Sequence, residues 1–217
     1  RILLTGSPMN EVLAAQRSAI EASDVLDRLA LEEGGYFLVS AHREENVDDP
    51  SRLSALLDCL EAVVAEFKLP VLVSTHPRTR KRLHEFGRDV PGVRFHKPLG
   101  FHDYNHLQLK AHCVLSDSGT IAEESSLLGF PAVTLRDSIE RPEALDTGSI
   151  IMTGLDPENV LLGLTCASRT RSGVVPTDYS ITNCSERTVN YLVSTSSRHM
   201  AWAGVRRLLS PSLSSGQ

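Results

Sequence analysis

The chain has 217 residues, 41% of them hydrophobic and 23% charged, which gives room for one substantial globular domain or two small ones. Its formal net charge is −5, from 22 basic and 27 acidic residues, and the sequence has no long basic run. Because binding to a phosphate backbone depends on basic surface, this charge argues against DNA or RNA as a partner.

The cysteines and the apolar runs set further limits. The four cysteines lie far apart with no C-x-x-C spacing, so we expect buried or incidental thiols in a reducing compartment rather than a zinc site or a disulfide framework. No apolar run approaches the roughly 20 residues that a membrane-spanning helix needs, and we see no signal peptide. These features predict a cytoplasmic protein without a membrane partner.

The order of the sequence patterns predicts an α/β fold. The chain opens on Arg1 in an apolar run, RILLTGSP, as if cut from a longer protein. Short β-branched runs then alternate with longer amphipathic ones, which is typical of βαβ units and a parallel sheet. We expect strands at residues 35–41, 70–75, 92–96, 113–117, 131–135 and 149–154. We expect helices at residues 9–28, 51–67, 79–86, 102–111, 119–128 and 157–164.

The last fifty residues depart from this alternation. Ser, Arg, Gly and Pro at residues 168–176 predict a surface loop. An amphipathic run at residues 185–194 and a short basic run at 201–209 follow, and residues 210–217 resemble a frayed tail.

Polar residues follow four of the expected strands. In an open parallel sheet, ligands bind outside the carboxyl ends of the strands. The residues found there are His42, Arg43 and Asn46 after the first strand, His76 and Arg78 after the second, Ser118 and Gly119 after the fourth, and Arg136, Arg141 and Glu143 after the fifth. Their occurrence at four strand ends predicts one polar rim.

Each group taken alone has a structural explanation. For His42, a satisfied structural histidine followed by a solvated loop, REEN, is the simpler interpretation. His76 before Pro77 fits a turn equally well, and ERPE fits a helix start with Pro142 at its first position. Ser118 could serve only as the N-cap of its own helix. The coincidence of all four groups at one edge favours a binding site.

Ser118 and Gly119 give the strongest signal. Glycine lets a ligand approach the backbone closely, and the amides at a helix start point toward an anion. The guanidinium of Arg141 is suited to a pyrophosphate. Glu124, about one helical turn further on, can accept hydrogen bonds from two adjacent ribose hydroxyls. We therefore predict a nucleotide site, and the lack of a G-x-G-x-x-G or Walker sequence disfavours a dinucleotide or ATP.

Three blocks in this order, SAHREEN, DSGTIAEES and RDSIERPEA, resemble the non-hydrolysing UDP-N-acetylglucosamine 2-epimerase family. The similarity runs from about Thr5 to at least Leu164, and the blocks are specific only together. The resemblance implies two Rossmann-like domains of the glycosyltransferase-B type, with the nucleotide held mainly by the C-terminal one. This chain matches that C-terminal, three-layer parallel-sheet domain, and the N-terminal domain is expected to be absent.

The resemblance also implies a division of the chain. Residues 1–33 correspond to the interdomain connecting segment and helix, and residues 34–167 to the UDP-binding Rossmann-like domain. Residues 168–209 form the C-terminal loop and helices, and 210–217 a disordered tail. The segment DYSITNCSERTVNYLVSTSSRHMAWAGVR is similar to the branch that acts on UDP-2-acetamido-2,6-dideoxy sugars on the way to N-acetyl-L-fucosamine.

Site residues carry over position by position. His42 matches the active-site histidine of the family, and Ser118 and Gly119 match its phosphate-binding turn. Glu124 matches the ribose carboxylate and Arg141 the diphosphate arginine.

Further positions are matched less closely. Leu99 and Tyr104, in KPLGFHDYN, fall where the family lines the uracil. Arg43 and His76 lie near positions that hold a second, activating UDP-sugar in some members, although STHPRT differs from their loop. Thr120 replaces the second glycine of the usual Ser-Gly-Gly, and we expect nucleotide binding to survive if Thr120 has helical dihedrals.

The family resemblance implies inversion at C2 of a UDP-N-acetyl sugar through elimination and re-addition of UDP, without a metal or redox cofactor. His42 would stabilise charge or donate a proton. The carboxylates that move the C2 proton belong to the N-terminal domain, so we expect this chain alone to bind UDP weakly and not to epimerise. The full-length protein is expected to be a homodimer.

Two other classes stay open at this point. A UDP-dependent glycosyltransferase domain shares the nucleotide-binding half, although the HREEN and ERPE blocks weigh against it. A non-catalytic UDP-sugar-binding module is the other.

Overall fold

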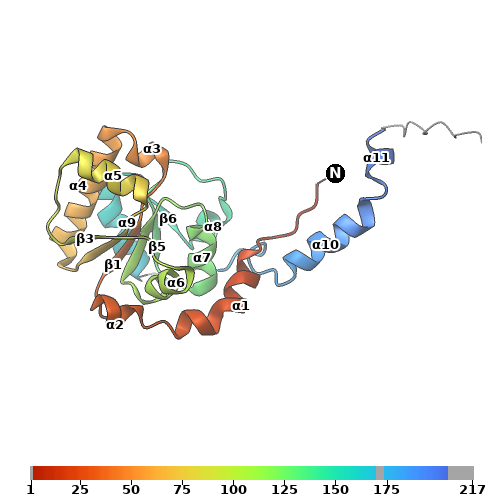
Figure 1. The fold of residues 1–217 in the computed structure, drawn as a ribbon, viewed down its shortest axis with the longest axis horizontal. Helices are drawn as coiled ribbons and strands as arrows, with labels where there is room; N and C mark the ends of the chain where they lie inside the picture. Colours follow the sequence, from red (N-terminus) through yellow and green to blue (C-terminus); the bar gives the residue numbers. More distant parts are fainter. Residues whose placement is uncertain (1, 170–173, 205–217) are drawn as a thin grey trace, which may run out of the picture.

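A computed structural model describes residues 2–169 and 174–204. Its centre is one sheet of six parallel strands in the order β3-β2-β1-β4-β5-β6 (Figure 1). The strands are β1 (Phe37–Ser40), β2 (Val71–Ser74), β3 (Val93–His96), β4 (Cys113–Ser116), β5 (Ala132–Thr134) and β6 (Ile151–Met152). Each lies within one of the six expected strands, which confirms the α/β, Rossmann-like prediction.

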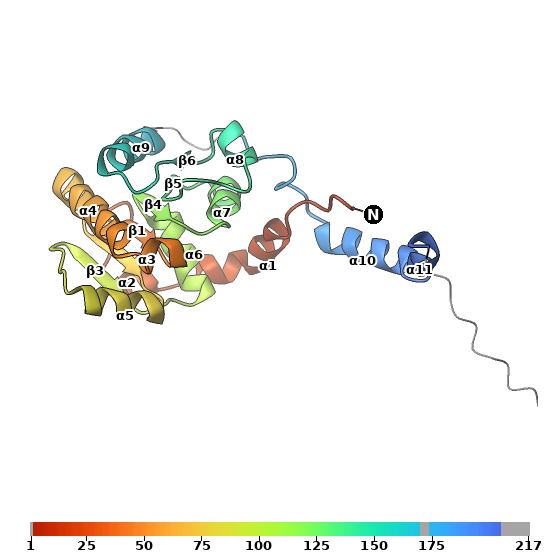
Figure 2. The ribbon, with the colours of Figure 1, turned by 90° about the horizontal axis from the view of Figure 1, so that it is seen from above.

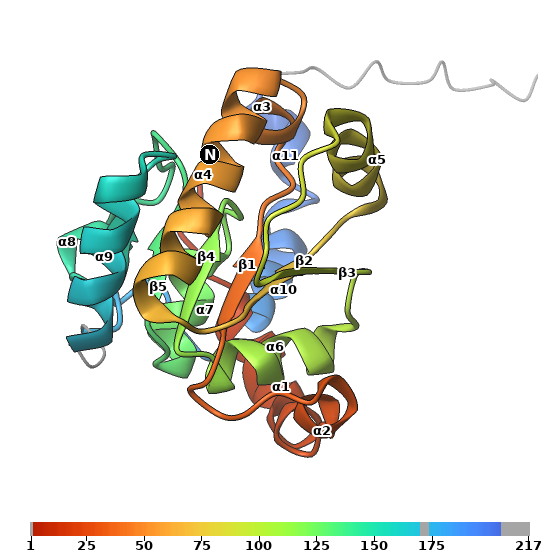
Figure 3. The same ribbon diagram turned by 90° about the vertical axis from the view of Figure 1, so that its left-hand side faces the viewer.

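Helices cover both faces of the sheet and give the expected three layers (Figure 3). The first face packs against α4 (Pro50–Phe67), α5 (Pro77–Phe86) and α9 (Pro157–Arg169). The second packs against α2 (Val25–Leu29), α6 (Phe101–Lys110) and α7 (Ile121–Leu128), and α1 (Met9–Glu21) lies on α6 and α7. Because both faces are covered, the central strands are apolar throughout, as in Phe37, Leu38 and Val39.

Two short helices follow strand ends, and two further helices leave the domain. The short helices are α3 (Glu44–Val47), after β1, and α8 (Glu143–Asp146), after β5. Figure 2 shows α10 (Cys184–Thr195) and α11 (His199–Trp202) extending away from the sheet. Within the described residues, no helix is long and apolar enough to cross a membrane.

The expected helix at residues 9–28 is wrong as a single element, because it breaks into α1 and α2. The hydroxyl of Ser23 accepts a hydrogen bond from the backbone N–H of Val25 and donates one of 2.6 Å to Asp103 on α6. These bonds replace helical ones and turn the chain onto the sheet. The long amphipathic pattern did not reveal a break that depends on a distant partner.

The segment REEN is not a solvated loop. Arg43 is the N-cap of α3 and the other three residues lie in this helix, in which Asn46 and Val47 are buried. The ERPE segment does start a helix, but Pro142 precedes the first residue of α8 instead of occupying it.

The C-terminal expectations are only partly covered by the described residues. Helix α9 runs to Arg169, so the expected loop begins later than residue 168. Residues 170–173, most of the basic run at 201–209 and the tail at 210–217 lie outside the described residues. The domain division stays a prediction.

The buried cysteines are free thiols. Cys59, Cys113 and Cys184 are buried, and Cys166 is exposed. Burial raises the pKa of Cys59 and of Cys113 to about 12, so both remain protonated thiols at neutral pH.

Gly163 provides a test of how closely α9 packs on the sheet. A Cβ at this position would lie 2.5 Å from Cγ2 of Thr153. The Thr153 side chain is held in place because its hydroxyl is within hydrogen-bond distance of the carbonyl oxygens of Thr134 and Gly154, to which it can donate. Glycine to alanine usually stabilises a helix, but here we expect Gly163→Ala to lower the free energy of unfolding by about 1–3 kcal/mol. Urea denaturation of the wild type and of the variant measures this difference in the free energy of unfolding.

The matched control is Leu162→Ala, on the exposed side of the same helix. We expect a change of less than about 0.5 kcal/mol for this variant. A Gly163→Ala protein as stable as the wild type would contradict the close packing.

Candidate functional site

The carboxyl ends of the strands form one row. In the parallel register Ser40 of β1 pairs with Ser74 of β2 and with Ser116 of β4, and Ser116 pairs with Thr134 of β5. The polar groups that follow β1, β2, β4 and β5 therefore start from the same edge of the sheet. This confirms the predicted arrangement of strand ends.

The strand order reverses between β1 and β4. Strands β2 and β3 lie beyond β1, and strands β5 and β6 lie beyond β4 on the other side. Chain connections leave these two neighbouring strands in opposite directions, and in open α/β sheets ligands bind at such a point. His42 follows β1, and Ser118 and Gly119 follow β4. Two of the main predicted groups thus flank this switch point.

A buried carboxylate ties the two strand ends together. Asp117, directly after β4, is fully buried and accepts hydrogen bonds from the backbone N–H of His42, at 3.0 Å, and of Arg43, at 2.9 Å. The side-chain amide of Asn46 donates a further bond of 3.1 Å. Nδ1 of His42 lies 3.5 Å from the same carboxylate and 3.3 Å from the hydroxyl of Ser40. The position of His42 is therefore set mainly through its backbone.

The Ser118-Gly119-Thr120 corner leads into α7. The Ser118 hydroxyl lies 3.0 Å from that of Thr120 and accepts a bond of 3.3 Å from the Thr120 N–H. Thr120 has helical dihedrals (φ −84°, ψ −12°), which meets the condition set for losing the second glycine. Helix α7 has no side-chain N-cap bond, so Ser118 is not simply the cap of α7. The first-turn amides of this helix are left without an intrahelical acceptor.

Gly119 is not required by the fold. Its φ lies outside the left-handed region, and a Cβ at this position would meet a single atom within 4 Å, Nη1 of Arg136 at 3.9 Å. By contrast, a Cβ on Gly6 or Gly92 would clash with neighbouring side chains. Neither backbone strain nor protein packing accounts for the glycine at 119, which leaves room for another molecule to approach the backbone here.

Arg141 lies beside the same helix start. Its guanidinium forms an ion pair with Glu123, in the first turn of α7, whose side chain is 6% exposed while that of Arg141 is 47% exposed. The structure therefore brings Arg141 and the Ser118-Gly119 corner to one side of the molecule.

Glu124 is held by a different neighbour. Nε2 of the buried Gln108, on α6, donates a hydrogen bond of 2.7 Å to Oε2 of Glu124. Tyr104 and Leu99 are half-buried at the start of α6, on the apolar cluster of the second sheet face. Burial, and then the charge of Glu124, raise the pKa of Tyr104, so its hydroxyl stays protonated near this carboxylate.

Arg43 and His76 follow the adjacent strands β1 and β2. Arg43 is paired at 3.4 Å with Glu45 and lies 3.6 Å from Glu140. His76 is exposed, and its Nδ1 accepts a hydrogen bond from the backbone N–H of Arg78 at the start of α5. Arg78 in turn pairs with Glu44 and Asp48. His76 thus caps α5, as expected if it serves only a turn before Pro77. Arg43 and His76 both follow strands at the predicted rim.

The sequence patterns did not indicate three residues that support the candidate site. Asp117, Glu123 and Gln108 hold His42, Arg141 and Glu124 respectively. Asp117 ends an apolar strand and Glu123 precedes the predicted ribose acid, so both stood inside a recognised block. Gln108 gave no local signal, because its role depends on α6 lying beside α7.

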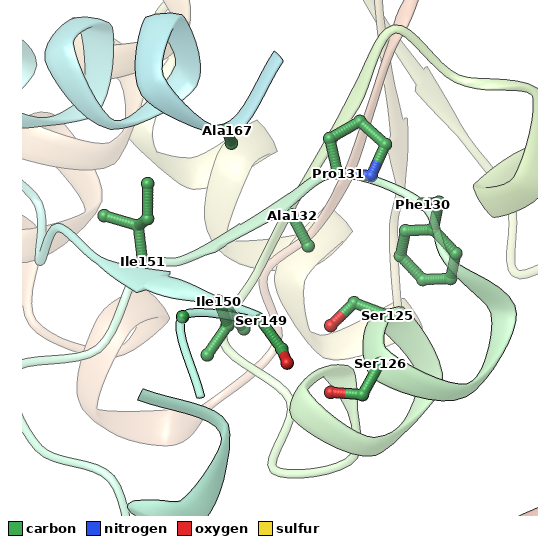
Figure 4. A pocket seen from close by; sticks show the side chains of 10 residues that line it. Ser125, Ser126, Phe130, Pro131, Ala132, Ser149, Ile150, Ile151 and Ala167 are labelled. Atoms are coloured by element: carbon green, nitrogen blue, oxygen red, sulfur yellow. The ribbon is translucent and has the colours of Figure 1, made fainter. Parts of the chain in front are cut away.

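A separate small pocket lies at the opposite edge of the sheet (Figure 4). Its lining comes from the starts of β5 and β6 and from α7, including Ala132, Ile151 and the serines 125 and 126. Both serine hydroxyls donate to the carbonyl oxygen of Ala122. This pocket contains none of the predicted site residues.

The fold and the rim define a Rossmann-like domain whose candidate site lies at the topological switch point. Residues 1–193 match the family model described as UDP-N-acetylglucosamine 2-epimerase. The chain belongs to this family.

Individual relatives agree with the family model. The chain is 37% identical over 131 residues to UDP-N-acetylglucosamine 2-epimerase of Methanococcus maripaludis, covering 58% of this chain and 36% of the relative. It is 32% identical over 162 residues to the Bacillus subtilis enzyme of the same name, covering 73% and 42%. The matched segments therefore cover less than half the length of these relatives.

Solved structures show the same fold. The Rickettsia bellii UDP-N-acetylglucosamine 2-epimerase is 37% identical with a TM-score of 0.79, covering 90% of this chain and 54% of that one. The Methanocaldococcus jannaschii enzyme, solved in complex with UDP-GlcNAc and UDP, is 27% identical with a TM-score of 0.80, covering 88% and 54%.

We expect Asp117→Asn to lower the free energy of unfolding by about 2–4 kcal/mol, because an amide can present only one acceptor oxygen to the donors that the carboxylate satisfies. Urea denaturation checks this. The exposed Asp146→Asn is the matched control and should change stability by less than about 0.5 kcal/mol. Equal stability of the two variants would show that the link between β1 and β4 is not needed.

Proposed function

We propose that this chain is the UDP-binding part of a UDP-N-acetyl-sugar 2-epimerase. The observation that carries the proposal is the Ser118-Gly119 corner, where a glycine that the fold does not need precedes an uncapped helix start. The amides of this helix start would bind the diphosphate, since a helix N-terminus attracts anions. Membership of the family supports the epimerase over a glycosyltransferase.

Arg141, Glu124, Leu99 and Tyr104 complete the proposed nucleotide site. Arg141, held by Glu123, would add a guanidinium to the diphosphate. Glu124 would accept hydrogen bonds from the ribose hydroxyls while Gln108 holds its second oxygen. Leu99 and Tyr104, half-buried at the start of α6, would line the uracil.

His42 would act where the bond between the sugar and the diphosphate breaks. Inversion at C2 by elimination of UDP requires that the leaving diphosphate be stabilised, and fixed hydrogen-bond donors supply such stabilisation without reorganisation. His42 stands at the switch point opposite the Ser118-Gly119 corner, with its side chain 46% exposed. It would stabilise the developing charge or donate a proton. Removal of the C2 proton is assigned to the part of the protein that this chain does not contain.

Other assignments of the whole protein are proposals of the same kind. The branch acting on UDP-2-acetamido-2,6-dideoxy sugars is supported by the sequence of residues 178–206 alone. A homodimer, a cytoplasmic location and an activating UDP-sugar near Arg43 and His76 remain predictions from the family resemblance and the composition.

Titration of the 217-residue chain with UDP tests the nucleotide site. We expect Glu124→Gln to weaken UDP binding by about tenfold and to leave pyrophosphate binding unchanged, because the single acceptor oxygen of an amide would have to serve both Gln108 and the ribose hydroxyls. The exposed Glu158→Gln, on α9, is the control and should bind both ligands like the wild type. Equal losses for UDP and pyrophosphate would contradict the assignment of Glu124 to the ribose.

We expect no epimerisation by the isolated chain, because the acid-base groups for C2 are assigned elsewhere. Incubation with UDP-N-acetylglucosamine in deuterated water, followed by NMR of C2, measures both inversion and proton exchange. The complete gene product should show both. Turnover by the isolated chain would contradict the assignment of the acid-base groups to another part of the protein. Binding of the UDP-sugar without turnover by the complete protein would favour a non-catalytic module.

A further inference from the structure

Arg136 is a buried cation that the proposed site has not yet used. It follows β5 and is 3% exposed, although arginine is almost never buried without partners. Its Nη2 donates to Glu140, which lies at the surface. Within the described residues, its buried Nε and Nη1 have no hydrogen-bond partner. Unpaired buried donors of a charged group cost free energy, so their retention calls for a reason.

The place of this guanidinium suggests the reason. Nη1 is the atom that a Cβ on Gly119 would meet, at 3.9 Å. The charge therefore lies directly beneath the Ser118-Gly119 corner and the start of α7. Two independent features, an uncapped helix start and a buried guanidinium with unpaired donors, converge on the same spot.

Several acids surround this spot, and a cation offsets their charge. The buried Asp117 carboxylate precedes the same corner and would repel a diphosphate. Arg136 is in electrostatic range of Asp117, Glu45 and Glu140, and the bond to Glu140 is the main cause of its raised pKa. Glu140 also lies 3.6 Å from Arg43, and its own pKa is lowered to about 2, so it is ionised at neutral pH.

We propose that Arg136 is a second guanidinium of the anion site, acting on the diphosphate from beneath the Ser118-Gly119 corner, with Glu140 as the surface carboxylate that partly neutralises it. The proposal rests on the proposed function for the identity of the ligand. It assigns to Arg136 a charge effect, which is felt strongly in a partly desolvated site. It also predicts that removing Glu140 strengthens anion binding.

NMR titrations of the chain with UDP, pyrophosphate and uridine test the proposal. We expect Arg136→Met to weaken UDP and pyrophosphate binding about tenfold and to leave uridine binding unchanged, and Arg136→Lys to retain most of the affinity. Glu140→Gln, a surface change, should tighten UDP and pyrophosphate binding about threefold. In the double variant Arg136→Met with Glu140→Gln the tightening should disappear.

Three results would overturn the proposal. One is an equal loss of uridine and UDP binding in Arg136→Met, which indicates a purely structural role. Another is Glu140→Gln binding UDP and pyrophosphate no more tightly than the wild type, a result that does not depend on how well the buried variant folds. The third is tightening that persists in the double variant, which would place the effect on Arg43.

The ligand series separates this proposal from the proposed function. A wild-type chain that binds pyrophosphate without preferring UDP contradicts the nucleotide assignment, while the pyrophosphate titrations still decide the role of Arg136. A wild-type chain that binds neither contradicts both.

Discussion

The candidate site depends on one buried carboxylate. Asp117 directly follows β4 and accepts hydrogen bonds from two consecutive backbone amides after β1 and from the side chain of Asn46. A buried charge without such partners would be strongly destabilising, so joining the two strand ends in this way supports the stability of the fold. The same contacts fix the backbone after β1 at the switch point and so position His42. Stability and the position of the site thus have a common cause.

The rim also shows how acids and guanidinium groups are combined. Arg141 is paired with Glu123, Arg136 with Glu140 and Arg52 with Asp137, and Arg52 donates to Asn46 as well. Each arginine is therefore held in place before any ligand arrives, which lowers the entropy lost on binding. The pairs also reduce the net positive charge of the free site. In the two-arginine site that we propose, affinity for an anion would depend on this balance between guanidinium groups and acids.

The two adjacent acids of α7, Glu123 and Glu124, contact different partners. They point to different neighbours because successive helical residues are about 100° apart around the axis. Glu123 contacts Arg141 on the β5 side, and Glu124 contacts Gln108 on α6. One helix turn thereby supports both the proposed diphosphate contact and the proposed ribose contact.

The sequence by itself determined the strands, most of the helices and the edge at which the polar groups meet, because hydrophobic periodicity and glycine or proline positions are local properties of a chain. It also supplied the family through three motif blocks. Only the tertiary structure decided that α1 and α2 separate at Ser23, that REEN forms a partly buried helix and that Asp117, Glu123 and Gln108 hold the predicted residues. The burial of Arg136 beneath Gly119 was equally hidden, since the two residues are 17 positions apart and meet only because β4 and β5 are neighbours in the sheet. Contacts between residues distant in sequence depend on packing, and no local pattern encodes them.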